Sequence, residues 1–265
     1  MEILLSAFLL SLVLVGIHAY FGLEIIRRGI VFTDLAVGQA AALGAAASLF
    51  FWDGRFLYIS SLLAALLIAF WISLASTRGR FSEAFIGLVY ALGISAVFLL
   101  LSKSPHGTEE FQQLLVSDLL YISPDQVAHT AGLYSLIGLA LWGLTRLPEG
   151  RLRHTGFFLL FALTVTSSVK LAGVLVVFAL LVGPALVAVT LCGRRLLWTA
   201  WVYGVIVNSC GTLASYHFDL PTGQTLVFCQ ALLGTLIYFF GGRRMDRSQN
   251  ESSSTLHKKQ GGKLF

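Results

Sequence analysis

Five polar side chains that could pass a small cation lie inside long apolar stretches of the sequence: His18, Asp34, Gln39, Asn208 and Gln230. A polar or ionisable group inside a membrane span is costly, so each of the five needs an explanation. Either these side chains line a polar path, or they join helices by hydrogen bonds worth about 1 kcal/mol each. Hydrogen bonding is favoured for His18, Asn208 and Gln230, the two interpretations are balanced for Gln39, and a functional role is favoured for Asp34.

Asp34 is the acidic member of this set, and it follows a pair of arginines. It lies six residues past Arg28, which places it roughly 9 Å deeper in the membrane if the segment is helical. The alternative to a functional role is an ion pair with Arg27 or Arg28 at the membrane boundary. The sequence leaves both possibilities open.

Nine apolar runs must position these side chains. Most are long enough to cross a hydrocarbon core about 30 Å thick at about 1.5 Å per residue. The chain is therefore predicted to be an all-α, polytopic transmembrane bundle of eight or nine spans. The runs are Ile3–Ile26, Ile30–Trp52, Phe56–Ala75, Phe81–Leu101, Val127–Leu144, Thr155–Leu171, Gly173–Cys192, Leu196–Tyr216 and Gln224–Phe240.

Composition and charge agree with a membrane protein. Apolar residues make up 57% of the chain and charged residues only 12%, about half the charged fraction of soluble domains. Of the 18 lysines and arginines, all but Arg55, Lys103 and Lys170 fall on one side of the alternating runs. Because cytoplasmic loops carry this excess, the N-terminus is predicted outside and the C-terminus inside. The net charge of +5 favours anionic lipid rather than nucleic acid as the partner.

The chain divides into a predicted transmembrane domain, residues 1–244, and a disordered basic cytoplasmic tail, residues 245–265. Pro184, inside the seventh run, predicts a kink or an interrupted helix there.

An outer loop between the fourth and fifth runs carries Glu109 and Glu110. These residues could receive a cation-carrying protein, or they could be part of a solvated acidic loop. Residues 112–120, in the same loop, predict a re-entrant or interfacial helix rather than a span.

The sequence contains no phosphate-binding motif of the form G-x-x-x-x-G-K-[ST]. Active transport would therefore be driven by an ion gradient or by a partner ATPase. The chain is not expected to be an enzyme: Ser215 and His217, two residues apart on a helix, point to different faces and do not form a catalytic dyad.

Four blocks, in order along the chain, resemble the membrane permeases of bacterial ABC importers for zinc, manganese and iron. They are Gly22–Asp34, with its arginine pair and aspartate, Glu83–Gly87, Val169–Ala185 and Ser215–Gly223. The resemblance implies a permease subunit in the bacterial cytoplasmic membrane that pairs with a second copy to form a dimeric pore. Cytoplasmic ATPase subunits would hold the ATP, and an extracytoplasmic binding protein would deliver the metal. The chain itself would bind no cofactor, the divalent metal being its cargo.

Other classes stay open at this point. The runner-up is a stand-alone secondary carrier or channel for a small cation. A third possibility is an intramembrane enzyme or a membrane partner that does not transport.

Two departures from the family pattern concern function. The family commonly has Asp-x-x-x-His in its second helix; Asp34 matches, but Gly38 stands at the histidine position. The resemblance therefore carries a metal ligand over to Asp34 alone and leaves the metal open.

The second departure is a short cytoplasmic loop, residues 147–154, where the family has a longer segment that contacts the ATPase. We predict that coupling to the ATPase uses Glu149, Arg151 and Arg153 of this loop.

Overall fold

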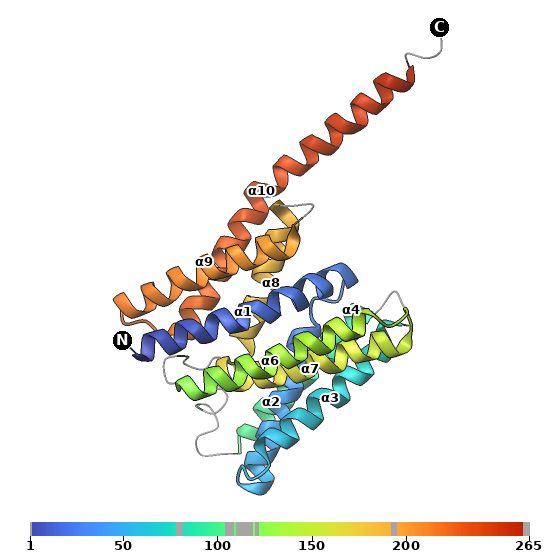
Figure 1. Ribbon diagram of the computed structural model, residues 1–265. Coiled ribbons are helices and arrows are strands. Elements are labelled where there is room, and N and C mark those ends of the chain that lie inside the picture. The colour runs from blue at the N-terminus through green and yellow to red at the C-terminus, as the bar shows by residue number, and fades with distance from the viewer. Residues whose placement is uncertain are drawn as a thin grey trace.

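The computed structural model of the chain is a bundle of long helices (Figure 1). It describes residues 2–77, 82–103, 109, 119, 122–191 and 195–261, with only the backbone described for 2–4 and 242–261. Over these residues, nine helices are long and apolar enough to cross a membrane. This confirms the all-α membrane fold and favours nine spans over eight, while the side on which each terminus lies stays a prediction. The helices are α1 (Glu2–Arg28), α2 (Thr33–Trp52), α3 (Leu57–Ser76), α4 (Ser82–Leu101), α6 (Pro124–Thr145), α7 (Arg151–Ala172), α8 (Val174–Leu191), α9 (Leu196–His217) and α10 (Thr222–Gly261).

The helices begin and end close to the ends of the apolar runs because local backbone signals stop them there. Gly29 after α1, Asp53 after α2 and Gly173 after α7 all have positive φ angles, of 66°, 49° and 84°. A positive φ angle departs from the helical backbone and so ends the helix, and at Asp53 the conformation is the left-handed one of a common C-cap. At the start of α6, Ser123 and Gln126 form a capping box, in which each side chain binds the other residue's backbone N–H.

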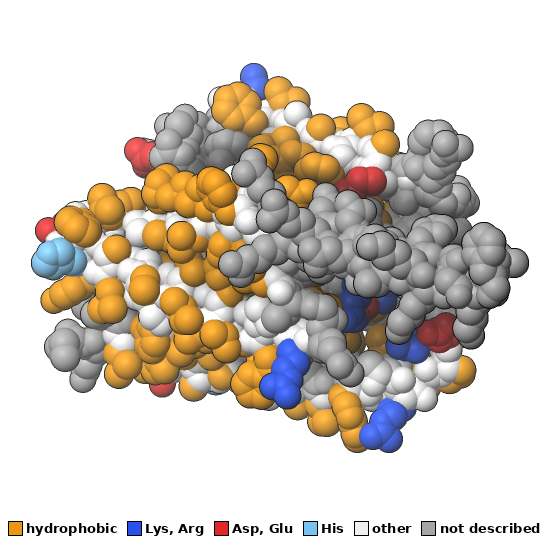
Figure 2. Space-filling view, turned by 90° about the horizontal axis from the view of Figure 1, so that it is seen from above, with side chains coloured by type: hydrophobic (Ala, Val, Ile, Leu, Met, Phe, Trp, Pro, Cys, Tyr) orange, Lys and Arg blue, Asp and Glu red, His pale blue; other side chains and the backbone are white. Residues whose placement is uncertain are grey.

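The bundle has an interior and an exterior set of helices. Most of each span in α1, α2, α7 and α8 is buried, whereas α3, α4, α6, α9 and α10 turn much of their surface outward. The outward faces are apolar: Leu88 and Leu92 of α4 are 72% and 71% exposed. Figure 2 shows hydrophobic side chains over most of the described part of one face, with few charged groups among them. Such a surface suits hydrocarbon, so the bundle is built to sit in lipid.

Glycines let some of these helices approach each other closely. A Cβ atom at Gly44 of α2 would lie 2.3 Å from the backbone oxygen of Ser60 on α3. Next to this contact, the Ser61 hydroxyl donates a hydrogen bond to the Ala41 carbonyl, over 2.8 Å. In lipid there is no hydrophobic driving force between helices, so helices associate through close backbone packing and through hydrogen bonds of hydroxyl groups.

Two expectations about helix continuity are changed by the structure. Helix α8 runs unbroken from Val174 to Leu191 with Pro184 inside it, so the helix is not interrupted; the kink stays a prediction. Helix α10 continues to Gly261, so most of the segment expected to be a disordered tail, 245–265, is helical in this structure. The division into a membrane domain and a tail stays a prediction. The re-entrant helix expected at 112–120 falls outside the described residues, apart from Leu119.

Candidate functional site

Asp34 is the most unusual polar residue of the described chain. It sits in the first turn of α2, the most enclosed helix of the bundle, and is 1% exposed. Neither of its carboxylate oxygens has a hydrogen-bond partner. A buried carboxylate without partners is strongly unfavourable unless something else compensates it. The ion-pair alternative does not hold in this structure, because Arg27 and Arg28 both pair with Glu24, at 3.0 and 3.6 Å.

Other buried oxygen atoms without partners lie on or beside the start of α2. They are Thr33 Oγ1, one step from Asp34, and Glu83 Oε2. The second oxygen of Glu83 accepts a hydrogen bond from the Phe32 N–H, at 3.1 Å, so this carboxylate of α4 caps the N-terminus of α2. No cluster of three or more His, Cys, Asp or Glu side chains that could hold a metal exists among the described residues.

Gln39, the other predicted path residue of α2, lies against α4. A Cβ atom at Gly93 of α4 would lie 2.9 Å from the Gln39 Cβ atom, so a glycine is needed opposite the amide. Gln39 is 1% exposed, and its Oε1 atom has no partner. Like Asp34, it is enclosed by the bundle rather than open to a passage.

Gly38 is closely packed, which explains why a histidine is absent from this position. A Cβ atom there would lie 3.1 Å from Val174 Cγ1 and 3.7 Å from Val169 Cγ2. An imidazole would have to displace these valines of α7 and α8. The missing histidine and the neighbouring valines therefore belong to one packing arrangement.

His18 has partners on a neighbouring helix and on its own. Its Nδ1 lies 2.8 Å from the Leu14 carbonyl and its Nε2 lies 3.0 Å from Ser168 Oγ of α7. Because a carbonyl oxygen only accepts, we assign the ring hydrogen to Nδ1. The ring also packs edge-on against Tyr134 of α6, with centroids 6.1 Å apart. These contacts match the hydrogen-bonding interpretation of His18.

Asn208 and Gln230 bind each other. Gln230 Nε2 donates to Asn208 Oδ1 over 2.8 Å, and Asn208 Nδ2 donates to the Ser11 carbonyl over 3.3 Å. Both side chains are fully buried, and together they join α1, α9 and α10. One acceptor is left over: Gln230 Oε1 has no partner.

The five path candidates thus fall into three groups, centred on α2, on the α1–α7 contact and on the α9–α10 contact. Among the residues that the structure describes, no hydrogen bond joins one group to another, and none of the five side chains is more than 1% exposed. In this conformation the five side chains are therefore enclosed and do not line an open path through the described part of the chain. Their role in transport stays a prediction.

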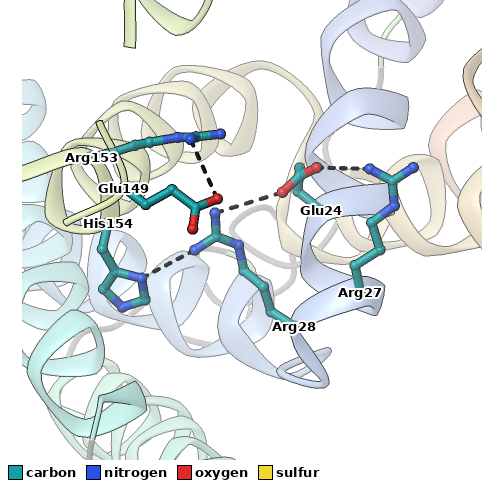
Figure 3. A network of polar contacts seen from close by, with 6 residues as sticks. All are labelled: Glu24, Arg27, Arg28, Glu149, Arg153 and His154. Carbon is teal, nitrogen blue, oxygen red and sulfur yellow. Dashed lines mark hydrogen bonds and ion pairs between the residues drawn. The ribbon is translucent and has the colours of Figure 1, made fainter. Parts of the chain in front are cut away.

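A polar network at the other candidate site joins the helix ends next to the loop at residues 146–150 (Figure 3). Arg28 donates to His154 Nδ1 over 3.2 Å, and its guanidinium lies 4.0 Å above the ring of Phe157. Since arginine only donates, His154 Nδ1 must accept, and Nε2 carries the hydrogen toward Ser76 Oγ at 2.8 Å. The network links α1, α3 and α7. The sequence alone did not predict this network, although it did single out the arginine pair at the end of the first apolar run.

The predicted coupling residues flank this network. Glu149 and Arg153 form an ion pair at 3.8 Å, with the Glu149 side chain almost fully exposed. Arg151 is exposed at the start of α7. The three side chains are accessible to a partner protein, and their role in coupling stays a prediction.

The structure describes one of the two predicted docking residues. Glu110 lies outside the described residues, and Glu109 is described as exposed. Their contact with an external protein stays a prediction.

Comparisons with known proteins agree with this architecture. The model of a family described as "ABC 3 transport family" matches residues 1–147 and 149–241. The "Chelated iron transport system membrane protein YfeD" of Yersinia pestis is 37% identical over 81 residues, 30% of this chain and 27% of that protein. The "Manganese transport system membrane protein MntB" of Synechocystis sp. is 27% identical over 174 residues, 59% of this chain and 56% of that protein. The matched regions thus span less than two thirds of the length of either relative.

A solved structure shares the fold over nearly the whole chain. It is "PsaBC from Streptococcus pneumoniae in complex with Fab", with a TM-score of 0.75 and 20% identity. The superposition covers 94% of this chain and 96% of that chain. At this identity, the likeness shows the arrangement of the helices and nothing finer.

Proposed function

Because this chain belongs to the ABC 3 transport family, we propose that it is the transmembrane permease subunit of an ATP-driven importer for a divalent metal ion. The single observation that carries the proposal furthest is the buried carboxylate of Asp34, whose oxygens lack partners. A membrane helix retains such a group when a cation or a proton has to meet it there. In this proposal Asp34 provides one ligand for the passing metal.

Manganese or iron is the cargo that we favour over zinc. The unpartnered groups at the start of α2 present oxygen atoms, from Thr33, Asp34 and Glu83. Carboxylate and other oxygen ligands suit manganese, whereas zinc sites draw mainly on histidine nitrogen and cysteine sulfur. Two relatives carry names that refer to chelated iron and to manganese transport. The glycine at position 38, where the family commonly has histidine, also favours manganese or iron over zinc.

A closed conformation accounts for the burial of the path residues. Asp34 and Gln39 are enclosed because α2 is surrounded by α3, α4, α7 and α8. Transport then requires these helices to move apart, which a partner ATPase would drive as it binds and hydrolyses ATP. Two copies of the chain would form the pore, and an external metal-binding protein would dock at the loop with Glu109 and Glu110.

The contact with the ATPase would lie at the loop before α7. Glu149, Arg151 and Arg153 are accessible there, and the Arg28–His154 contact fixes the start of α7 to α1. A displacement of this loop would therefore be transmitted to two further helices, α1 and α3, through hydrogen-bonded side chains. Replacing Glu149, Arg151 and Arg153 together should weaken co-purification with the ATPase.

Uptake of radioactive manganese and iron by cells, with and without this gene, tests the proposal. Asp34→Ala and the isosteric Asp34→Asn should reduce uptake to background while the protein level in the membrane is unchanged. Asp53→Asn is the matched control, because Asp53 is an exposed carboxylate at the opposite end of the same helix and asparagine tolerates its left-handed backbone. Normal uptake by both Asp34 variants would remove the metal ligand from the proposal.

The energy source separates the proposal from a stand-alone carrier. Uptake should stop when cellular ATP is depleted and should survive collapse of the proton gradient. Vesicles holding this chain alone, transporting at the full rate on an ion gradient, would instead establish the secondary carrier.

A further inference from the structure

A groove of about 480 Å³ runs along the outside of the bundle between α6 and α9, with α1 as its floor. In Figure 1, α1 lies between α9 and α6. The lining includes Gly16 of α1, Gly138 and Trp142 of α6, and Trp201 of α9. The volume falls in the range of roughly 300–1,000 Å³ that is usual for small-molecule sites.

The lining is mainly apolar, and several of its polar groups are bonded within the protein. The Ser135 hydroxyl donates to the Ala131 carbonyl over 2.8 Å, and the Thr145 hydroxyl donates to the Trp142 carbonyl over 2.7 Å. The indole N–H of Trp201 donates to the Gly16 carbonyl over 2.9 Å. Apart from the hydroxyls of Tyr20 and Tyr134, an occupant therefore meets mainly hydrocarbon and aromatic surface.

The shape of the groove suits a chain that stands upright in the membrane. Its α6 wall extends from Ala131 to Thr145, about 21 Å along a helix. One leaflet of the hydrocarbon core is about 15 Å deep, so the groove begins at the interface and passes the midplane. Gly16 and Gly138 deepen it, since a Cβ atom at either would meet nothing within 4 Å.

One end of the groove is basic. Arg146 follows directly after Thr145, and its guanidinium lies 4.2 Å above the ring of Trp142. Arg195 precedes the groove-lining Leu197 by two residues and is exposed. Within the described part of the chain, neither arginine forms an ion pair. An apolar groove thus ends at two exposed arginines that form no ion pair with any residue the structure describes.

We propose that this groove binds an anionic phospholipid, with an acyl chain along α1 and the phosphate between Arg146 and Arg195. Basic pockets between membrane helices recognise anionic head groups in this way, and arginine pairs well with phosphate. Indole rings such as those of Trp142 and Trp201 are commonly found at the level of the head groups.

Charge complementarity favours a lipid, rather than a helix from a second copy of the chain, as the occupant of the groove. Two copies related by a two-fold axis along the membrane normal bring residues of equal depth together. Arg146 and Arg195 would then face the partner's own basic ends at the same level. A phosphate neutralises the two arginines, whereas a second copy adds like charge beside them.

Quenching of tryptophan fluorescence by brominated lipids tests the proposal directly, without any transport assay. A variant that keeps only Trp201, with phenylalanine at the other tryptophan positions so that a ring remains beneath Arg146 at position 142, reports on the groove. A variant that keeps only Trp71 in the same way, exposed on α3 and outside the groove, reports on bulk lipid. Both are reconstituted in phosphatidylcholine vesicles with rising fractions of brominated phosphatidylglycerol or brominated phosphatidylcholine.

We expect Trp201 to be quenched at a several-fold lower fraction of the anionic lipid than of the zwitterionic one, and Trp71 to show no preference. Arg146→Gln with Arg195→Gln should remove the preference, since each arginine contributes about fivefold near an anionic head group. Gly138→Leu should also remove it by filling the groove. Gly132→Leu is the matched control, being an equally open glycine of α6 outside the groove.

Equal quenching of Trp201 by the two lipids would overturn the proposal, and it is also the result expected if a second copy fills the groove. An anionic preference that is the same at Trp71, or that persists in the double arginine variant, would overturn it as well. So would equal effects of Gly138→Leu and Gly132→Leu.

Discussion

Arg28 and His154, 126 residues apart in the sequence, meet through a 3.2 Å hydrogen bond from the guanidinium to Nδ1. The contact ties the end of α1 to the start of α7, and His154 passes it on to Ser76 of α3. Three helix ends are thereby held together beside the loop that we propose as the ATPase contact. Their connection has consequences that can be measured.

Removing Arg28 should destabilise the bundle. Arg28→Ala loses the bond to His154, the ion pair with Glu24 and the stacking on Phe157. We expect a loss of about 1–3 kcal/mol, seen as a fall of several degrees in the apparent Tm of the purified protein. Arg27→Ala is the matched control: its side chain is 57% exposed and, among the described residues, pairs with Glu24 alone, so its effect should stay within about 0.5 kcal/mol. Equal effects of the two variants would contradict a structural role for the network.

Variants of the Asn208–Gln230 pair test whether the pair stabilises the helix bundle or takes part in transport. Gln230→Leu leaves Asn208 Oδ1 buried without its donor and should cost about 1–3 kcal/mol. The double variant with Asn208→Leu should cost less than the sum of the two single variants, because neither amide of the pair is then left buried without the other.

Metal uptake by the same variants decides between the two interpretations. If the pair only joins helices, the double variant that reaches the membrane should transport at the normal rate. A folded double variant without uptake would place the two amides in the transport path.

Restoring the family's histidine should be harmful in this chain. Gly38→His places an imidazole against Val174 and Val169, and overpacking of this kind costs about 1–3 kcal/mol. Combining it with Val174→Ala should recover much of the lost stability, measured by thermal unfolding in detergent. If Gly38→His folded as well as the parent chain, the packing explanation for Gly38 would be wrong.

The contact between α2 and α3 should be sensitive to a single methyl group. At Gly44, a Cβ atom would lie 2.3 Å from the Ser60 oxygen, so Gly44→Ala must push the helices apart and should cost at least about 3 kcal/mol. Gly87→Ala, at an open position of α4, should be neutral or stabilise by up to about 1 kcal/mol. Folded yield and apparent Tm of the two variants would separate these outcomes, and similar values would contradict the close approach.

The sequence by itself predicted eight or nine spans and, to within a few residues, their ends; the structure favours nine. This is because the length of an apolar run decides whether it crosses a membrane, and residues such as Gly29 and Gly173 stop a helix locally. It also singled out Asp34, since the cost of a carboxylate in a span is a property of the residue and its surroundings in the sequence.

Only the tertiary structure decided what each polar group meets. Asn208 and Gln230 bind each other, while Asp34 has no partner, although all three sit in equally apolar runs. Which faces of two helices touch depends on packing between segments far apart in the chain, and that information is not contained in the pattern of any one span.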